Sequence, residues 1–406
     1  MKQPKGTVET ASTTERLPLE YSGTRGAQVP TGIATAIACA MLFRGLIFAL
    51  GVVSVYTAEA KFNPDNATGT PWVAWDGIHY VTLVYQGYAP DMDSARFPLI
   101  AFFPMLPILA RPLALVLPGA AALVLIANIC AVVGFGFLYA WAKELVGARI
   151  AIMCVLIMST FPGAVFFSAA LTEGPFFMMV SMALWMLQRG RFWPAAVIAA
   201  LATALRPTGV ALAALIPIYY FIQHPQLPFG KRAAMFVLLG FISCSGGMLY
   251  EAFLWNRYGV HDAYVQAQHK WEEGDKEMIK QEAAEGMKRY SLRFFIDRAG
   301  RPQAWNRVVA LVLVIITVVG FFKPGPIPKA FFLVPLLIFL MTYIPNNGLR
   351  SSSIIRYETA GVPIFLLGTI WLAKFQRRGV LITLLSIQLL MQCYYAILFS
   401  RGSWVG

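Results

Sequence analysis

Apolar runs of about 18 residues or more recur along most of this chain of 406 residues. A bilayer core is about 30 Å thick, and a helix needs roughly 20 apolar residues to cross it. The chain is 58% hydrophobic and 13% charged, whereas soluble domains carry about 25% charged residues. A fold surrounded by water would lack the charge to cover its surface. The pattern therefore predicts an all-α polytopic membrane protein.

The net charge of +13 has a membrane explanation. Lys and Arg cluster in short segments between apolar runs, where the positive-inside bias and anionic headgroups favour them. This distribution argues against nucleic acid as a partner. All the cysteines lie in or beside apolar runs without a CxxC spacing, so free thiols are expected rather than disulfides or a zinc site. They are Cys39, Cys130, Cys154, Cys244 and Cys393.

The chain is organised as a tail and one domain. Residues 1–30 are polar and net basic and predict a disordered cytoplasmic tail, ahead of a single transmembrane domain over 31–406. The first span is expected over about 31–57. Two polar segments, 58–97 and 254–305, are assigned to the outside. The other apolar runs cover about 98–118, 119–141, 149–168, 175–188, 193–222, 233–253, 306–322, 330–344, 357–373 and 379–399.

Two of these runs are ambiguous. The run 98–118 is rich in proline, which an uninterrupted helix tolerates poorly. The run 193–222 is long for one span and carries Arg206-Pro207 at its middle. If 98–118 is re-entrant or skims the membrane and 193–222 is a hairpin that breaks at Arg206, the basic clusters become cytoplasmic. We adopt this topology of about eleven spans; in the alternative, 98–118 spans and 193–222 is one helix.

The adopted topology has a consequence that did not enter its choice. Asp76, Arg96, Glu173, Arg206 and Arg356 all fall on one side of the membrane. A membrane enzyme that works at the outer interface needs this arrangement. We therefore expect an active site on the periplasmic side of a bacterial inner membrane, or on the lumenal side of the endoplasmic reticulum if the protein is eukaryotic.

Asp76 opens a stretch in which Ile78, Val81 and Tyr85 recur at helical spacing, which predicts a short interfacial helix in the first outside loop. Two roles are open for Asp76. It can cap this helix, or it can act as a general base that takes a proton from an acceptor hydroxyl. His79 is expected to orient or hydrogen-bond a neighbour rather than to be a second base.

Arginines inside spans or at their ends are a second signal, because a guanidinium in a bilayer usually marks function. Arg44 lies inside the first span, Arg206 at the hairpin break, and Arg96 and Arg356 at span ends. The structural alternatives are snorkelling for end positions and an ion pair with Glu173 for Arg44 and Arg206. Converging arginines would instead suit a lipid-linked phosphate, whose oxygens the planar fork binds bidentately.

The acidic candidates are fewer. Glu173 begins a span, where the helix dipole stabilises a carboxylate, so it either caps the helix or binds substrate. Asp91 and Asp93 have the spacing of a metal-binding pair, but two aspartates in an acidic loop are usually solvated. No cofactor is expected, and a divalent metal is the less favoured alternative. The chain has no GxGxxG, Walker A or HExxH motif, which argues against nucleotide-driven transport and the common zinc proteases.

Seven short motifs follow one another along the chain after about Arg44. They are Trp75-Asp76, Phe102-Phe103-Pro104-Met105-Leu106-Pro107, Thr172-Glu173-Gly174-Pro175-Phe176-Phe177, Arg206-Pro207-Thr208-Gly209, Gln266-Ala267-Gln268-His269-Lys270-Trp271, Arg356-Tyr357 and Trp404-Val405-Gly406. Their order and topology resemble the PIG-V family, which comprises GPI mannosyltransferase 2 and its bacterial relatives within the GT-C glycosyltransferase superfamily. Thr172 and Thr208 depart from the serine and asparagine that are frequent in this family.

The resemblance implies a GT-C fold and transfer of mannose from a polyprenyl- or dolichyl-phosphate donor to a lipid-linked or glycan acceptor. It implies that Asp76 is the base of an inverting displacement at the anomeric carbon. The donor phosphate is expected on Arg206 and Arg356, with Arg44 and Arg96 as further candidates. The residues expected to contact substrate are Trp75, His79, Tyr80, Glu173, Gln268 and Trp271.

Two other functions stay open on the sequence. The same fold could transfer another sugar, of the arabinose type or another hexose. A transporter or flippase of lipid-linked sugars belongs to a different class, and many transporters carry an inverted repeat that is not detectable here. A structural scaffold would not explain arginines in the membrane that face an aspartate outside it.

Overall fold

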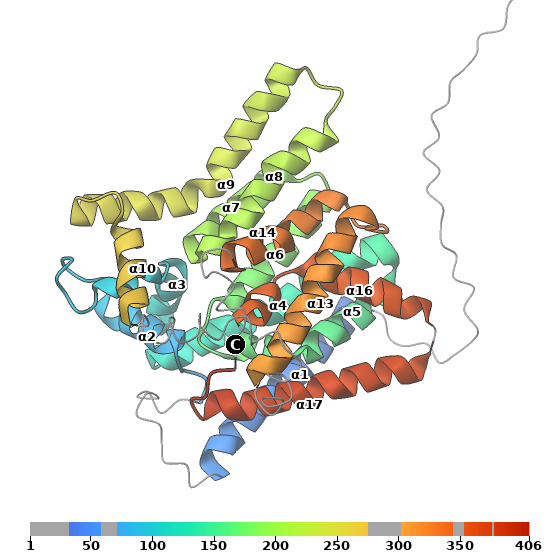
Figure 1. The fold of residues 1–406 in the computed structure, drawn as a ribbon, viewed down its shortest axis with the longest axis horizontal. Coiled ribbons are helices and arrows are strands. Elements are labelled where there is room, and N and C mark those ends of the chain that lie inside the picture. The colour runs from blue at the N-terminus through green and yellow to red at the C-terminus, as the bar shows by residue number, and fades with distance from the viewer. Residues whose placement is uncertain (1–31, 58–70, 275–301, 344–352, 376, 406) are drawn as a thin grey trace, which may run out of the picture. The chain divides into compact units, whose positions relative to one another are not determined.

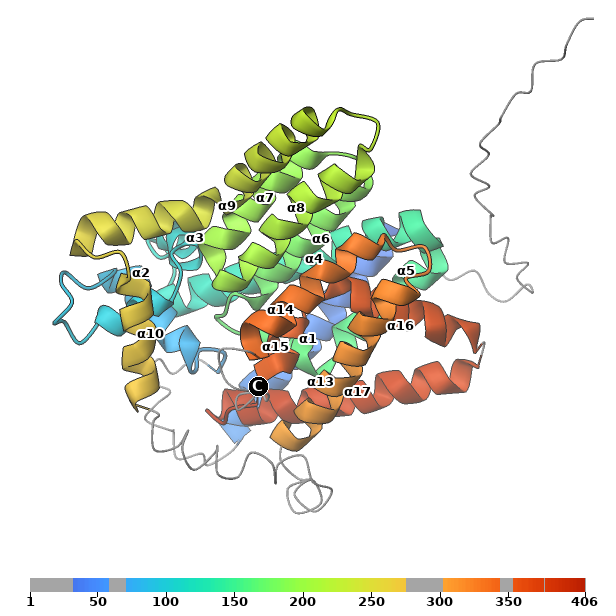
Figure 2. The same ribbon diagram turned by 45° about the horizontal axis from the view of Figure 1, so that its top comes forward.

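The computed structural model describes residues 32–57, 71–274, 302–343, 353–375 and 377–405, all within the unit Thr31–Gly406. These residues form helices, and no strand occurs among them (Figures 1 and 2). In chain order the helices are α1 (Ile33–Thr57), α2 (Asp76–Gln86), η1 (Phe97–Ala101), α3 (Met105–Leu113), α4 (Gly119–Val146), α5 (Ala148–Thr160), η2 (Pro162–Ser168), α6 (Glu173–Gln188), α7 (Phe192–Leu205), η3 (Pro207–Gly209), α8 (Val210–Gln223), α9 (Phe229–Tyr258), α10 (Ala263–Gly274), α13 (Pro302–Phe322), η5 (Lys329–Phe332), α14 (Leu333–Tyr343), α15 (Ile354–Glu358), α16 (Val362–Lys374) and α17 (Arg378–Ser400).

Five of the described helices are long and apolar enough to cross a membrane, namely α1, α4, α9, α17 and the part of α13 over Ala304–Phe322. A bent pair, α5 with η2, raises the count to as many as six. Four more apolar segments of 10–17 residues include α7 and α16. The count of about eleven spans stays a prediction.

The long helices leave apolar side chains uncovered. Phe236, Val237 and Phe241 on α9 are exposed, as are Ile382 and Leu390 on α17. Soluble monomers rarely expose large apolar patches, whereas lipid tails are as apolar as these side chains. The uncovered faces therefore agree with helices that stand in a bilayer.

Helix α4 packs against α1, α3, α5 and α6 and carries much of the core. Small residues allow a close approach to α6: a Cβ on Gly174 would collide with the carbonyl of Ala127, and one on Gly134 with the ring of Phe177. Small residues at such interfaces let helix backbones in membranes come together. The start of α6, with Glu173, consequently lies buried against α4.

The predicted run 149–168 is bent rather than straight, because α5 and η2 meet at 77°. Pro162 starts η2 and has no N–H to donate to the preceding helix. Arg44 of α1 supplies donors at this bend: its guanidinium donates to the carbonyl of Ala164, to that of Ser159 at 2.9 Å and to the hydroxyl of Ser168 at 3.4 Å. A buried guanidinium on α1 thus holds the bend.

The run 193–222 forms a helical hairpin that breaks at Arg206, as predicted. Arg206 has extended backbone, with φ −167° and ψ 155°, between α7 and the short helix η3. The ring of Phe192, at the start of α7, contacts Tyr220 and His224 at the end of α8, with centroids 5.0 and 5.4 Å apart. Helices α7 and α8 lie side by side in both views (Figures 1 and 2).

The run 98–118 does not form one long helix. It divides into η1 and α3, and α3 has nine residues, far fewer than the roughly 20 needed to cross a bilayer. Ile108, Leu115 and Val116 of this segment are exposed. The adopted topology, in which this run does not span, is compatible with these lengths.

All five cysteines of the chain are free thiols.

Candidate active site

The segment before α2 is fixed by an aromatic stack. Trp72 is fully buried and stacks between Phe48 of α1 and Phe399 of α17, with ring centroids 5.9 and 6.0 Å apart. Trp75 follows with φ +55°, the one positive φ at a non-glycine residue in the described part of the chain. Large side chains adopt this conformation only where the surroundings impose it. The turn at Trp75 makes Asp76 the first residue of α2.

Asp76 does not cap its helix. The cap position is occupied by Trp75, which makes no side-chain cap hydrogen bond. The Asp76 carboxylate instead faces Arg356 of α15, with Oδ2 2.7 Å from Nη2. The capping alternative is therefore wrong, and an ion pair replaces it. The Asp76 side chain keeps 33% of its surface exposed, so a reactant has access to it.

A line of four charged side chains extends from Asp76 into the protein. Arg356 Nε lies 2.6 Å from Glu173 Oε1, and Arg206 Nη1 lies 3.2 Å from the same oxygen. The four residues come from α2, α15, the start of α6 and the hairpin turn after α7. The structure thus brings Asp76, Glu173, Arg206 and Arg356 together at atomic distances, and the side of the membrane on which they lie stays a prediction.

Beyond Asp76, the side chains of this line are buried. The Arg356, Glu173 and Arg206 side chains expose 5%, 0% and 7% of their surface. Burial acts to lower the pKa of Arg356, but the carboxylates of Asp76 and Glu173 outweigh it and raise that pKa well above its ordinary value. Two carboxylates and two guanidinium groups balance in charge, as buried ions require.

Aromatic rings surround both guanidinium groups. Arg206 lies over Phe176 and Tyr357, with Cζ 5.2 and 4.7 Å from the ring centroids. Arg356 lies 5.8 Å from the centroid of Phe166. Cations are attracted to the faces of aromatic rings, and more so where water is excluded. The rings therefore hold the two arginines in place without neutralising them.

The C-terminal segment closes one side of the site. The ring centroid of Trp404 lies 5.4 Å from that of Trp75 and 5.5 Å from Cζ of Arg356. The segment is anchored by Asn306 of α13, whose amide donates to the carbonyl of Val405 at 2.7 Å. Tyr395 of α17 donates its hydroxyl to Asn306 Oδ1 at 2.7 Å.

Replacing Trp404 by alanine is expected to lower activity about 10-fold, because Arg356 and Trp75 lose a shared ring contact. Phenylalanine at this position should retain most of the activity. Trp193, which is exposed at the start of α7, provides a matched control, and its alanine variant should be unaffected. Initial rates of sugar transfer, measured on folded protein, test this expectation. Equal rates for both alanine variants would contradict the role of Trp404.

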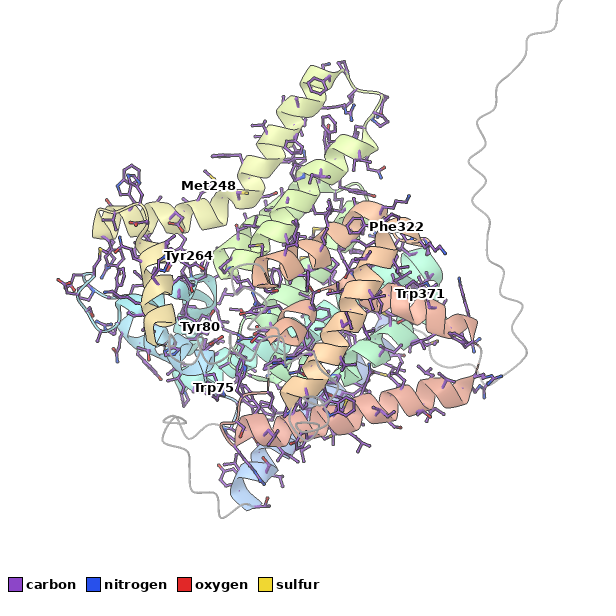
Figure 3. All side chains as sticks on the ribbon, in the orientation of Figure 1. Trp75, Tyr80, Met248, Tyr264, Phe322 and Trp371 are labelled. Atoms are coloured by element: carbon purple, nitrogen blue, oxygen red, sulfur yellow. The ribbon has the colours of Figure 1, made fainter. Side chains whose placement is uncertain are left out.

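His79 and Tyr80 lie within the first turns of α2 and share a neighbour, since both rings contact Phe102, at 4.9 and 5.3 Å between centroids. Burial lowers the pKa of His79, against the opposing charge of Asp76. Burial, followed by the charge of Asp76, raises the pKa of Tyr80, so its hydroxyl stays protonated. Trp75 and Tyr80 are labelled in Figure 3.

The predicted contacts on α10 are less complete. Gln268 donates from Nε2 to the hydroxyl of Tyr264 at 3.0 Å, and Tyr264 packs edge-on against Phe103 at 5.6 Å. Tyr264 is labelled in Figure 3, in the part of the molecule that also holds Tyr80. Trp271 lies on the same helix, and its side chain falls outside the described residues. Within the described residues, the side-chain hydrogen bond of Gln268 is thus to Tyr264 and not to one of the four charged residues.

Arg44 and Arg96 do not join the line of charges. Arg44 donates hydrogen bonds to carbonyls at the bend between α5 and η2. Arg96 donates from Nη1 to the carbonyls of Gln86 and Gly87, at 3.1 and 3.3 Å, and so satisfies acceptors at the end of α2. The structural alternatives expected from the sequence are an ion pair of Arg44 with Glu173 and snorkelling of Arg96. The observed contacts differ from both. Both arginines bind backbone carbonyls.

Asp91 and Asp93 form a turn. Asp91 Oδ1 accepts the backbone N–H groups of Asp93 and Ser94, at 3.1 and 2.9 Å. Within the described stretches, no group of three or more His, Cys, Asp or Glu residues is placed to hold a metal ion.

Glu358 is a buried acid that sequence reasoning missed. It is 1% exposed, and neither carboxyl oxygen has a hydrogen-bond partner among the described residues. A carboxylate that is buried without a partner is costly in its ionised form. The residue ends α15, two positions after Arg356. The sequence also does not indicate that Tyr357, Phe166 and Phe176 contact the arginines of the site, because a cation–π contact has no spacing signature along the chain.

A glutamine at position 358 is expected to stabilise the protein at neutral pH. Near pH 7 an ionised carboxylate at this position is buried without a partner among the described residues and costs stability, whereas near pH 4 the carboxyl is protonated and carries no charge. The Glu358→Gln variant has no such loss, so its Tm should exceed that of wild type near pH 7 and match it near pH 4. Thermal unfolding between about pH 4 and pH 8 measures this. Parallel pH profiles would contradict the assignment.

The fold and the site together define an integral membrane protein in which a line of buried charged side chains ends at a partly exposed aspartate. A family model described as Mannosyltransferase (PIG-V) matches residues 64–284, more than half of the chain. The chain therefore belongs to this family and is a multi-pass membrane protein. The matched range includes Asp76, Glu173 and Arg206, whereas Arg356 lies beyond it.

No match was found among curated proteins. Among solved structures, the chain is similar to the crystal structure of the Archaeoglobus fulgidus oligosaccharyltransferase in complex with Zn and sulfate, with 12% sequence identity and a TM-score of 0.48. The similarity covers 91% of this chain and 53% of that chain. The present chain thus spans about half the length of that protein.

Proposed function

We propose that this enzyme moves a mannose from a polyprenyl- or dolichyl-phosphate donor to a lipid-linked or glycan acceptor, on a GT-C fold and by an inverting displacement. The observation that carries the proposal is the line Asp76–Arg356–Glu173–Arg206, in which a partly exposed carboxylate pairs with one buried guanidinium group and a buried carboxylate joins that group to a second. Transfer of a sugar from a phosphate ester to a hydroxyl uses both ends of such a line.

The guanidinium end suits the donor phosphate. When the bond between the anomeric carbon and the phosphate oxygen breaks, that oxygen gains negative charge. Arg206 and Arg356 present planar forks that match phosphate oxygens, and their burial strengthens the attraction. The aromatic rings around them offer no competing negative charge. A departing phosphate is thereby stabilised where the charge develops.

The carboxylate end suits the acceptor. In the proposed step the acceptor hydroxyl oxygen forms a bond to the anomeric carbon while the bond to the phosphate oxygen breaks. The hydroxyl proton passes to Asp76, and the phosphate leaves with the bonding electron pair. Attack from the face opposite the phosphate inverts the configuration at the anomeric carbon. Trp75 and Tyr80 flank Asp76 along the chain and are proposed to contact the sugar.

Purified protein incubated with a panel of radiolabelled polyprenyl-phosphate sugars tests this proposal. We expect transfer from the mannose donor, with glucose and arabinose donors at least about 10-fold slower, and a product of inverted anomeric configuration. Preference for another sugar would keep the reaction and replace the substrate. Movement of the intact donor across a vesicle membrane, without transfer, would favour a flippase instead.

The side of the membrane on which the site lies is tested with single cysteines in a cysteine-free background. Cysteines at the exposed positions 90 and 262 should react with an impermeant thiol reagent from the outside of sealed membranes. Those at 145 and 190 should react only after the membrane is opened, because the adopted topology makes their loops cytoplasmic. Labelling of positions 145 and 190 in sealed membranes would place those loops outside and contradict the topology.

A further inference from the structure

Glu173 occupies an unusual position between the two arginines. A single oxygen, Oε1, accepts from Arg356 Nε at 2.6 Å and from Arg206 Nη1 at 3.2 Å. The other oxygen, Oε2, is buried and has no hydrogen-bond partner in the described part of the chain. A carboxylate held for structure alone is expected to satisfy both oxygens. Here one oxygen bridges two guanidinium groups and the other has none.

The charge count of the site adds a second constraint. Asp76, Glu173, Arg206 and Arg356 sum to zero charge, and three of the four side chains are nearly inaccessible to water. A phosphate that enters this line adds at least one negative charge to a buried site that is already balanced. Buried charge without a partner is costly. The phosphate therefore binds well only if a resident anion gives up its place.

We propose that Glu173 is an internal counter-ion that occupies the donor-phosphate position in the empty enzyme and is displaced from at least one arginine when the phosphate binds. This inference rests on the proposed function, because it assigns the phosphate to Arg206 and Arg356. A carboxylate oxygen and a phosphate oxygen are both anionic acceptors for the same N–H donors. Glu173 thus holds the two arginines converged before substrate arrives.

The start of α6 offers a displaced carboxylate a favourable electrostatic field. Glu173 is the first residue of α6, and Thr172 before it makes no side-chain cap hydrogen bond. The first turn of a helix has N–H groups without helical acceptors and carries a partial positive charge. A carboxylate that turns away from Arg356 or Arg206 therefore still faces a favourable field. Arg356 keeps a partner in Asp76 throughout.

The test is the affinity of the purified protein for a short-chain polyprenyl phosphate. Glu173→Gln removes the competing charge, so the affinity should rise about 10-fold, and adding Arg206→Gln should abolish the gain. Glu144→Gln is the matched control: it removes an acid that pairs with Arg189 at 2.6 Å, outside the site, and should leave the affinity unchanged. Size-exclusion profiles and Tm establish that each variant is folded.

Several outcomes overturn the inference. Folded Glu173→Gln protein with unchanged or weaker affinity would make Glu173 a structural or ligand-binding residue. In wild type, a structure with bound polyprenyl phosphate should show Oε1 more than about 4 Å from one of the guanidinium groups, beyond ion-pair distance; both contacts intact would also overturn it. Binding without any sugar transfer would refute the proposed function and leave the counter-ion role standing. No binding of the phosphate by any variant would refute both.

Discussion

Replacing Asp76 by asparagine is expected to reduce mannosyl transfer at least about 100-fold while the protein still inserts and folds. Asparagine keeps the shape of the side chain and removes its ability to accept a proton. Its amide oxygen still accepts from Arg356, which lies 2.7 Å from the carboxylate, so the geometry of the line is retained. The loss should therefore appear in kcat, with donor binding changed much less.

The control for this experiment is Asp93→Asn, which removes an exposed acid from the same predicted loop and should transfer at the wild-type rate. Rates are measured with saturating donor on protein of matched Tm. A folded Asp76→Asn enzyme with near-normal activity would exclude Asp76 as the base. The base would then have to be sought among the other polar groups around α2.

The second large effect is expected at Arg356, which joins the two carboxylates. In Arg356→Gln, Asp76 and Glu173 lose the cation between them and a single guanidinium remains. Removing one partner of a buried ion pair costs about 3–5 kcal/mol, so the variant should unfold at a markedly lower temperature and show no measurable transfer. Arg356→Lys should keep part of the stability but lose activity, because an ammonium group lacks the fork that reaches both carboxylates.

A double variant separates charge balance from function. Arg356→Gln combined with Glu173→Gln restores the balance, so most of the lost stability should return while transfer stays absent. Thermal unfolding and transfer rates on the two single variants and the double variant complete the cycle. Recovery of transfer in the double variant would show that Arg356 acts only as a counter-ion and does not hold the donor phosphate.

Sequence reasoning reached the site through charge and topology. The position of basic clusters predicted a hairpin at Arg206, and the structure has that hairpin. The same topology placed Asp76, Glu173, Arg206 and Arg356 on one side. Charged groups are costly inside a bilayer, so they gather in the protein interior or at the membrane surface. The helical nature of the chain followed from long apolar runs. These signals are local or depend only on the side of the membrane, so a single sequence carries them.

The remainder depends on tertiary contacts that no spacing reveals. Arg44 and Arg96 have the appearance of phosphate ligands, but they donate to backbone carbonyls at a bend and at a helix end. Pro162 was a visible sign of that bend. The place of Trp404 follows from a hydrogen bond between Asn306 and Val405, 99 residues apart. Such long-range partners are set by the packed fold.

The most direct test of the central claim is transfer by the purified full-length protein reconstituted in lipid nanodiscs. The donor is polyprenyl-phosphate mannose labelled in the sugar, and a membrane lipid extract supplies the acceptors. We predict a labelled lipid or glycan distinct from the donor, formed by wild type and by Asp93→Asn but not by Asp76→Asn or Arg356→Lys. No labelled product from wild type with any acceptor fraction, or equal product from all four proteins, would contradict a mannosyl transfer centred on Asp76 and its buried partners.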